Sequence, residues 1–116
     1  MRRRLMLAAI ACLALAGPAG AHHGWGSYDA SKVLTLDGIV TEVRADNPHA
    51  ELKLEVSGKV WLVTLSPPSR MANRGKPISD IKVGDRLVAV GYPSKVNPDE
   101  IRAERITHGG MTIELR

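Results

Sequence analysis

The stretch 33-VLTLDGIVTEVRA-45 is rich in β-branched and aliphatic residues and carries a single glycine, Gly38, near its middle. Its apolar phase falls on Leu34 and Leu36 before this glycine, and on Ile39 and Val43 after it. A change of phase at a glycine predicts a β-bulge, which lets one long strand bend sharply. We therefore expect a bent first strand.

The next stretches predict a β-hairpin. The sequence ELKLEV at 51–56 alternates strictly between polar and apolar residues, as a half-buried strand does. Ser57-Gly58 then forms a two-residue turn into KVWLVTLS at 59–66. Both faces of this last strand are apolar, so we expect it to be central or to have one face covered by another element.

A short helix is predicted by SPPSRMANRGKP at 66–77. Ser66 is its expected N-cap, prolines occupy its first turn, and Gly75 is its stop. Three further strands are predicted after the helix, the last of them short. They are RLVAVGYP at 86–93, EIRAERI at 100–106 and MTIELR at 111–116.

This order of elements predicts a mainly β protein with an OB-fold-like five-stranded barrel and one short helix between strands 3 and 4. An open α+β sheet is the alternative. We favour the barrel, because closure pairs the strand edges that so small a sheet would leave open. The expected core consists of Leu36, Ile39, Val43, Leu52, Leu54, Val60, Leu62, Val88, Val90, Ile101 and Ile106.

The first 21 residues, MRRRLMLAAIACLALAGPAGA, have the composition of a secretory signal peptide. Arginines precede an apolar run, and small residues lead to Ala21, after which we expect cleavage. This predicts a periplasmic or secreted bacterial protein. The apolar run is shorter than the roughly 20 residues that a membrane-spanning helix needs, so no integral membrane segment is expected after cleavage.

Cys12 offers an alternative, because a cysteine after an apolar stretch can become the lipid-modified first residue of a lipoprotein. We favour cleavage after Ala21, since Ala9-Ile10-Ala11 lacks a larger aliphatic residue three positions before the cysteine. The mature chain then runs from His22 to Arg116 without a cysteine. We divide it into an arm at 22–32 and a barrel domain at 33–116.

Charge and composition exclude some classes of function. The whole chain has a formal net charge of +4, and three of its positive charges lie in the expected leader. The mature protein is therefore close to neutral, and only 3% of the chain is aromatic. Nucleic-acid binding through a basic surface or through stacked bases is not expected.

The histidines are the strongest candidates for chemistry. Cleavage after Ala21 would leave His22 with a free amine beside its own imidazole, and His23 follows directly. Amine and imidazole nitrogens together favour Cu(II). A further imidazole, from His49 or His108, would complete such a metal site. The plainer interpretation is that the pair consists of polar residues near a cleavage site that tolerates most sequences.

Two other groups are candidates for ligand or partner contact. Trp25 and Tyr28 lie among glycines and can fold back over a barrel face, either to bind something or to anchor the arm. Arg70 and Arg74 are spaced i,i+4 on the predicted helix, so they share one face. That face either binds an anionic partner or is simply solvated.

No catalytic grouping is evident. The serines lie in predicted turns or caps, and Asp99-Glu100 is the only adjacent pair of carboxylates in the predicted barrel. We therefore expect a non-catalytic periplasmic copper-binding protein. The alternative is a module that docks on another cell-envelope protein or on a small ligand without metal. An oxidase or hydrolase built on the histidines ranks third, because so small a barrel offers little concavity for a substrate.

The mature chain also resembles a family of small exported bacterial proteins classed as a domain of unknown function. The stretches that carry this resemblance are the histidine pair in AHHGWGSYD, the Asn-Pro-His turn ending at His49, and Gly-Tyr-Pro at 91–93. The resemblance implies a secreted, barrel-like β domain and brings no activity with it. It gives additional weight to His22, His23 and His49 as a set.

Overall fold

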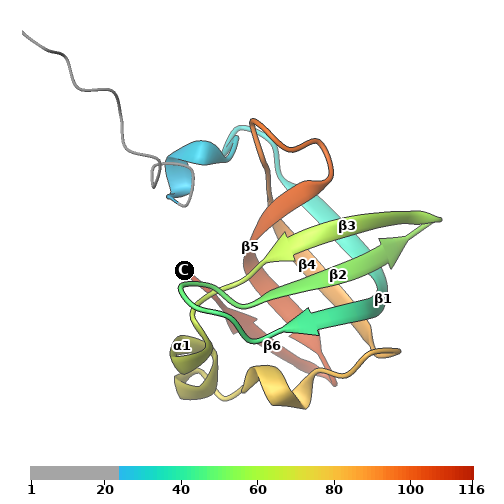
Figure 1. Ribbon diagram of the computed structural model, residues 1–116, viewed down its shortest axis with the longest axis vertical. Helices are drawn as coiled ribbons and strands as arrows, with labels where there is room; N and C mark the ends of the chain where they lie inside the picture. The colour runs from blue at the N-terminus through green and yellow to red at the C-terminus, as the bar shows by residue number, and fades with distance from the viewer. Residues whose placement is uncertain (1–23) are drawn as a thin grey trace, which may run out of the picture.

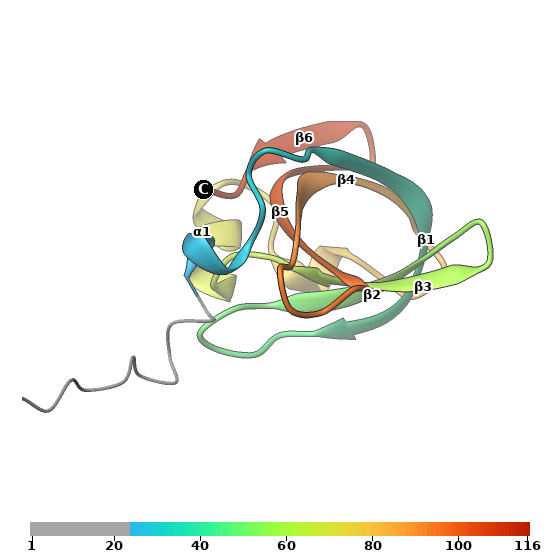
Figure 2. The same ribbon diagram turned by 90° about the horizontal axis from the view of Figure 1, so that it is seen from above.

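The computed structural model describes residues 24–116. Five strands close into a barrel in the order β3-β2-β1-β4-β5, and β3 pairs in parallel with β5 to complete the ring (Figures 1 and 2). The sixth strand extends the sheet beyond β5. The strands are β1 (Leu34–Arg44), β2 (Glu51–Val56), β3 (Lys59–Thr64), β4 (Arg86–Pro93), β5 (Glu100–His108) and β6 (Met111–Glu114). The expected OB-like barrel is thereby confirmed.

The expected helix lies between β3 and β4 as α1 (Pro68–Asn73), and two short 3-10 helices, η2 (Trp25–Ser27) and η3 (Ile78–Asp80), complete the secondary structure of the described residues. The N-cap of α1 is Pro67, so the expectation of Ser66 was wrong by one residue. The Ser66 hydroxyl instead donates to the carbonyl of Leu115 after β6. Gly75, with φ of +93°, follows the helix where the stop was expected.

The first strand bends as predicted, but not at its glycine. The register of β1 with β2 shifts between Val40 and Glu42, so the irregularity lies two to four residues beyond Gly38. Ile39 therefore points outward, 45% exposed, and Val40 takes its place in the core at 1%. Gly38 has another role: a Cβ there would collide with the carbonyl oxygen of Glu55, because β2 crosses it closely.

Half of the expected core is confirmed. Residues from every strand of the barrel and from α1 and η3 form one buried cluster. Its expected members are Leu36, Leu52, Leu54, Ile101 and Ile106, and Val43 packs against it while half-buried. Members that sequence reasoning missed include Leu65, Met71, Ile78, Ile81 and Leu115. The helix and the C-terminal segment therefore close the barrel with side chains of their own.

The inward face of β3 and β4 was predicted one residue out of phase. Val60 is 46% exposed, whereas Val63 is fully buried. In β4, Leu87 and Ala89 are buried and the expected Val88 and Val90 are only half-buried. Both strands are apolar on both faces, so their own periodicity leaves the phase open.

The register of β3 follows from the hairpin. Ser57 and Gly58 have φ of +50° and +83°, as a two-residue turn requires. This turn pairs Trp61 with Leu54, and Val63 with Leu52. Residues paired across two strands share one face of the sheet, so the buried leucines of β2 turn Trp61 and Val63 inward. Leu62 consequently lies on the outer surface.

The N-terminal arm is tied to one end of the barrel. Tyr28 forms a bridge with Ser94, just after β4, and the amide of Asp29 donates to the carbonyl of Pro93. Lys95 donates two hydrogen bonds to the arm. Its amide donates to the carbonyl of Ser27, and its ammonium donates to the carbonyl of Gly26. Within the part of the chain that is described, helices long and apolar enough to cross a membrane do not occur.

Candidate functional site

A groove of about 440 Å³ opens where the arm meets the barrel. Its walls are the β1–β2 loop, the β4–β5 loop, the arm, and the outer surface of β3. OB barrels bind their ligands in this region, on the face of strands 2 and 3 between the same two loops. We call it the acidic groove; it is lined by Ser27, Tyr28, Asp46, Asn47, Pro48, His49, Glu51, Leu62, Thr64, Ser94, Val96, Asn97 and Glu100.

The charge of the groove is one-sided. Three carboxylates, those of Asp46, Glu51 and Glu100, line it together with the imidazole of His49. Among the described residues that line it, none is lysine or arginine. A concave surface lined by charges of one sign concentrates ligands of the opposite sign. The acidic groove is therefore suited to a cation.

Three hydrogen bonds hold the Glu100 carboxylate in place in the groove wall. Its Oε2 accepts bonds from the hydroxyls of Tyr28, at 2.5 Å, and Thr64, at 2.9 Å. Its Oε1 accepts a bond from the side-chain amide of Asn97, at 2.9 Å. These bonds join the arm, β3 and the β4–β5 loop at one carboxylate, so the shape of the groove depends on Glu100.

This environment shifts the pKa of the Tyr28 hydroxyl. Burial raises the pKa of Tyr28 to about 12, with the hydrogen bond to Glu100 and the charge of that carboxylate as further causes. The residue is 6% exposed. Tyr28 therefore anchors the arm as a neutral donor, which is one of the two roles that the sequence left open for it.

His49 lies in the β1–β2 loop and is half-buried. The next residue, Ala50, is fixed on both sides of its peptide: its amide donates to the carbonyl of Ser66, and its carbonyl accepts from the amide of Leu65. The backbone next to Ala50, including that of His49, is consequently held in place on the rim of the acidic groove. This places an imidazole, a common metal ligand, in the lining of the groove.

The structure does not bring His108 to His49. Glu100 of the groove begins β5 and His108 ends it, so about 26 Å of strand separates them. Nδ1 of His108 accepts from the ammonium of Lys76 at 3.0 Å, and Nε2 donates to Asp85 at 2.8 Å. Both ring nitrogens are engaged, and His108 fastens the far end of the barrel. Of the two histidines suggested for completing a metal site, only His49 lies in the groove.

His22 and His23 lie outside the described residues, and the structure places neither of them. Ser27, which lines the acidic groove, follows His23 by four residues. Four residues of extended chain span about 14 Å. Within residues 24–116, no three His, Cys, Asp or Glu side chains gather closely enough to hold a metal ion.

Residues 9–100 match the family of unknown function DUF6152. The chain belongs to this family. Among curated protein sequences, no relative of this DUF6152 member was found. The match covers the histidine pair, the arm, the Asn-Pro-His turn and the whole acidic groove up to Glu100.

Solved structures show the same fold in part of a larger enzyme. TiaS in complex with its tRNA and ATP superposes with a TM-score of 0.53 and 21% identity, covering 77% of this chain and 20% of that chain. TiaS lacking its ZRD, in complex with agmatine, gives 0.51 and 21%, covering 76% and 25%. This DUF6152 chain thus spans a quarter or less of the TiaS chains that it matches. The likeness concerns the barrel alone.

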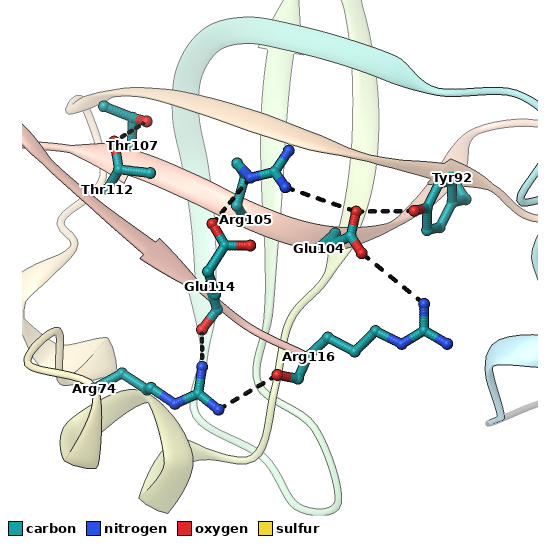
Figure 3. Close-up of polar contacts among 8 residues, drawn as sticks. All are labelled: Arg74, Tyr92, Glu104, Arg105, Thr107, Thr112, Glu114 and Arg116. Carbon is teal, nitrogen blue, oxygen red and sulfur yellow. Dashed lines mark hydrogen bonds and ion pairs between the residues drawn. The ribbon is translucent and has the colours of Figure 1, made fainter.

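The remaining candidates, Trp25, Arg70 and Arg74, lie together on the other side of the arm. The Trp25 ring meets Tyr92 edge-on, with centroids 6.1 Å apart. The guanidinium of Arg74 donates to the carbonyls of Glu114, at 2.7 Å, and Arg116, at 3.3 Å (Figure 3). Arg70 donates to the carbonyl of Leu115 at 3.4 Å. The shared helix face was correctly expected, and it fastens the end of β6.

Two central residues escaped sequence reasoning. Glu100 and Arg102 alternate with the buried Ile101 and Ala103 in β5, which is the usual pattern of solvated charges on an outer face. The arm covers this face, so Arg102 is only 5% exposed. The available signal was the pair of aromatic residues in the arm, because they must pack against some part of the barrel.

Proposed function

We propose that this DUF6152 protein is an exported, non-catalytic binding protein whose acidic groove takes Cu(II). In this proposal the ligands are the terminal amine and imidazole of His22, the imidazole of His23, and that of His49. The single observation that carries it is the position of His49: it stands on a groove with three carboxylates, whose wall continues into the arm that follows the histidine pair.

The chemistry of the donors supports copper over other divalent ions. A set of nitrogen ligands follows the general order of affinity in which Cu(II) is bound most tightly. The mature chain has no thiol, because Cys12 lies in the expected leader. Carboxylates around the groove stabilise the added positive charge without taking part in the inner set of ligands.

A binding role rather than catalysis is supported by the state of Glu100. Both of its oxygens already accept hydrogen bonds from neighbouring side chains. A carboxylate so engaged stabilises the groove and is poorly placed to act as a general base. The groove is also bounded by loops on two sides, which favours capture and release of a ligand.

Calorimetric titration with CuCl₂ tests the proposal. The mature protein beginning at His22 is compared with a form whose amino-terminal amine is acetylated, with His49→Gln, and with His108→Gln as the matched control. We expect affinity to fall at least tenfold with the acetylated amine and with His49→Gln, and to stay unchanged in His108→Gln. Equal affinity in all four proteins would show that neither the amine nor His49 belongs to the site.

A second candidate function rests on the size of the groove. Its volume of about 440 Å³ is much larger than a single ion and its water ligands, and Leu62, Pro48 and Val96 add apolar surface to it. A basic segment of another envelope protein would fit these features without metal. Capture from envelope extracts in the presence of a chelator, with Glu51→Gln beside the wild type, tests it. A partner lost from Glu51→Gln supports docking, and an identical set of captured proteins contradicts it.

A further inference from the structure

On the side of the arm facing away from the acidic groove, arginine side chains from three elements converge. Arg102 occupies the central position of a row across three strands, between Thr64 of β3 and Tyr92 of β4. Its side chain leaves the barrel on the outer face, where Trp25 and Tyr28 cover it. The result is an arginine residue that is only 5% exposed on the outside of a barrel.

Two guanidinium groups share the ring of Trp25. That of Arg102 lies 4.2 Å from the ring centroid, and that of Arg116 lies 4.6 Å from it. Each contact is a favourable cation–π interaction. Together they hold two like charges beside one indole, and Arg116, whose side chain is 55% exposed, leaves this site open to solvent.

Helix α1 brings further positive charge. Arg70 and Arg74 donate to the carbonyls of Glu114, Leu115 and Arg116, so their guanidinium groups end beside the C-terminal segment that carries Arg116. Burial lowers the pKa of Arg102, and the charges of Arg70 and Arg116 lower it further, whereas Tyr28 and the charge of Glu100 raise it. We call Arg70, Arg74, Arg102 and Arg116 the arginine cluster.

The neighbouring carboxylates are already shared among other donors. Glu104 accepts a bond from Tyr92 at 2.8 Å and lies 3.9 Å from both Arg105 and Arg116 (Figure 3). Glu114 is paired with Arg105 at 3.0 Å. One half-buried carboxylate thus serves two arginines and a tyrosine, and the cluster keeps an excess of positive charge.

We propose that the arginine cluster is an oxyanion site, in which Arg70, Arg102 and Arg116 bind a phosphate group beside Trp25. Guanidinium groups match the oxygens of a phosphate in pairs, and a dianion between them would relieve their mutual repulsion. The buried Arg102 supplies a fixed donor, and the exposed Arg116 closes over the ligand. The group can belong to free phosphate or to a phospholipid head group.

Trp25 provides the readout. The chain has two tryptophans, so a Trp61→Phe background leaves Trp25 as the only indole. Its fluorescence is followed during titration with inorganic phosphate at constant ionic strength, with NaCl as the compensating salt. We expect a saturable change, at least tenfold weaker in Arg116→Gln and in Arg70→Gln. The matched control is Arg86→Gln, since Arg86 is exposed and paired with Asp37 at the far end of β4.

A second assay distinguishes free phosphate from a phospholipid head group. Vesicles of phosphatidylglycerol are compared with vesicles of phosphatidylcholine in a sedimentation assay. Binding to the anionic vesicles that Arg116→Gln abolishes, without a response to inorganic phosphate, assigns the site to a lipid head group. The proposal is overturned if NaCl alone gives the same fluorescence change, if Arg86→Gln weakens binding as much as Arg116→Gln, or if neither form of phosphate binds.

This site is independent of the proposed copper function. The residues proposed to hold phosphate and those proposed to hold copper are different, so the phosphate response should persist in His49→Gln. Loss of copper binding with an intact phosphate response would contradict only the proposed function, and the reverse result would contradict only the oxyanion site.

Discussion

At the scale of single residues, Glu100 and Arg102 show how charges on the outside of a small barrel become half-buried or buried. Both point away from the core, and the arm then covers them. Glu100 is compensated by three hydrogen bonds, and Arg102 by the rings of Trp25 and Tyr28. Buried charges of this kind are tolerated because polar or aromatic groups replace the water that they lose.

The ionisation of Tyr28 gives a prediction for alkaline pH. Its pKa is raised to about 12, above the value near 10 of an unfolded chain, so the folded state favours the neutral phenol. The associated stability is fully present below about pH 10 and is lost as the pH rises towards about 12. In a Tyr92→Phe protein, Tyr28 is the only tyrosine, and absorbance at 295 nm should show phenolate forming near pH 12.

The matched variant for this measurement is Tyr28→Phe in the same background. Its free energy of unfolding should no longer carry the extra decline that Tyr28 produces between about pH 10 and pH 12. A phenolate forming near pH 10 in the folded protein would show that Tyr28 is not buried beside Glu100 in solution.

At the scale of elements, the glycines and the turn decide how strands lie together. Gly91 permits β5 to approach β4, because a Cβ there would collide with the carbonyl oxygen of Arg102. Gly38 does the same for β1 and β2. These are sites of close backbone approach, and the true irregularity of β1 lies beyond Gly38. The sequence shows where the glycine lies, but it does not show which neighbouring strand approaches it closely.

The helix α1 is joined to β6 through Ser66. Ser66 is 1% exposed, and its hydroxyl donates to the Leu115 carbonyl. We expect Ser66→Ala to lower the free energy of unfolding by about 1–2 kcal/mol, since a buried acceptor loses a partner. Hydrogen exchange should accelerate at the amides of Ile113 and Leu115. The exposed Ser69→Ala is the control, with a change within about 0.5 kcal/mol. Faster exchange confined to the first turn of α1 would instead make Ser66 a helix cap.

At the scale of the whole molecule, barrel closure depends on a short parallel pairing. Only Leu62–Thr64 of β3 and Glu100–Arg102 of β5 are in register there. Val63 and Ile101 form the central pair, and both are fully buried. The pairing joins residues far apart in the chain, so it gains its stability from the common core rather than from local structure.

Ile101→Ala tests the closure. A cavity at this position should cost about 2–5 kcal/mol of unfolding free energy, measured by urea denaturation. Because all strands share one core, hydrogen-exchange protection should fall throughout β1 to β5. Val96→Ala, at a position 75% exposed, is the control and should change stability by less than about 0.5 kcal/mol. Loss of protection in β5 alone would mean that the barrel can open while its remaining strands stay folded.

The amino-acid sequence alone determined the order of strands, the helix between β3 and β4, the Ser57-Gly58 turn and the barrel class, because each depends on local periodicity and turn chemistry. It also suggested His49 as a candidate ligand, which the structure places in the lining of the acidic groove. Only the tertiary structure decided which face of β3 and β4 is buried and that His49 and His108 lie at opposite ends. It likewise decided that the arm covers Glu100 and Arg102. These features depend on contacts between residues distant in the chain, which no local pattern encodes.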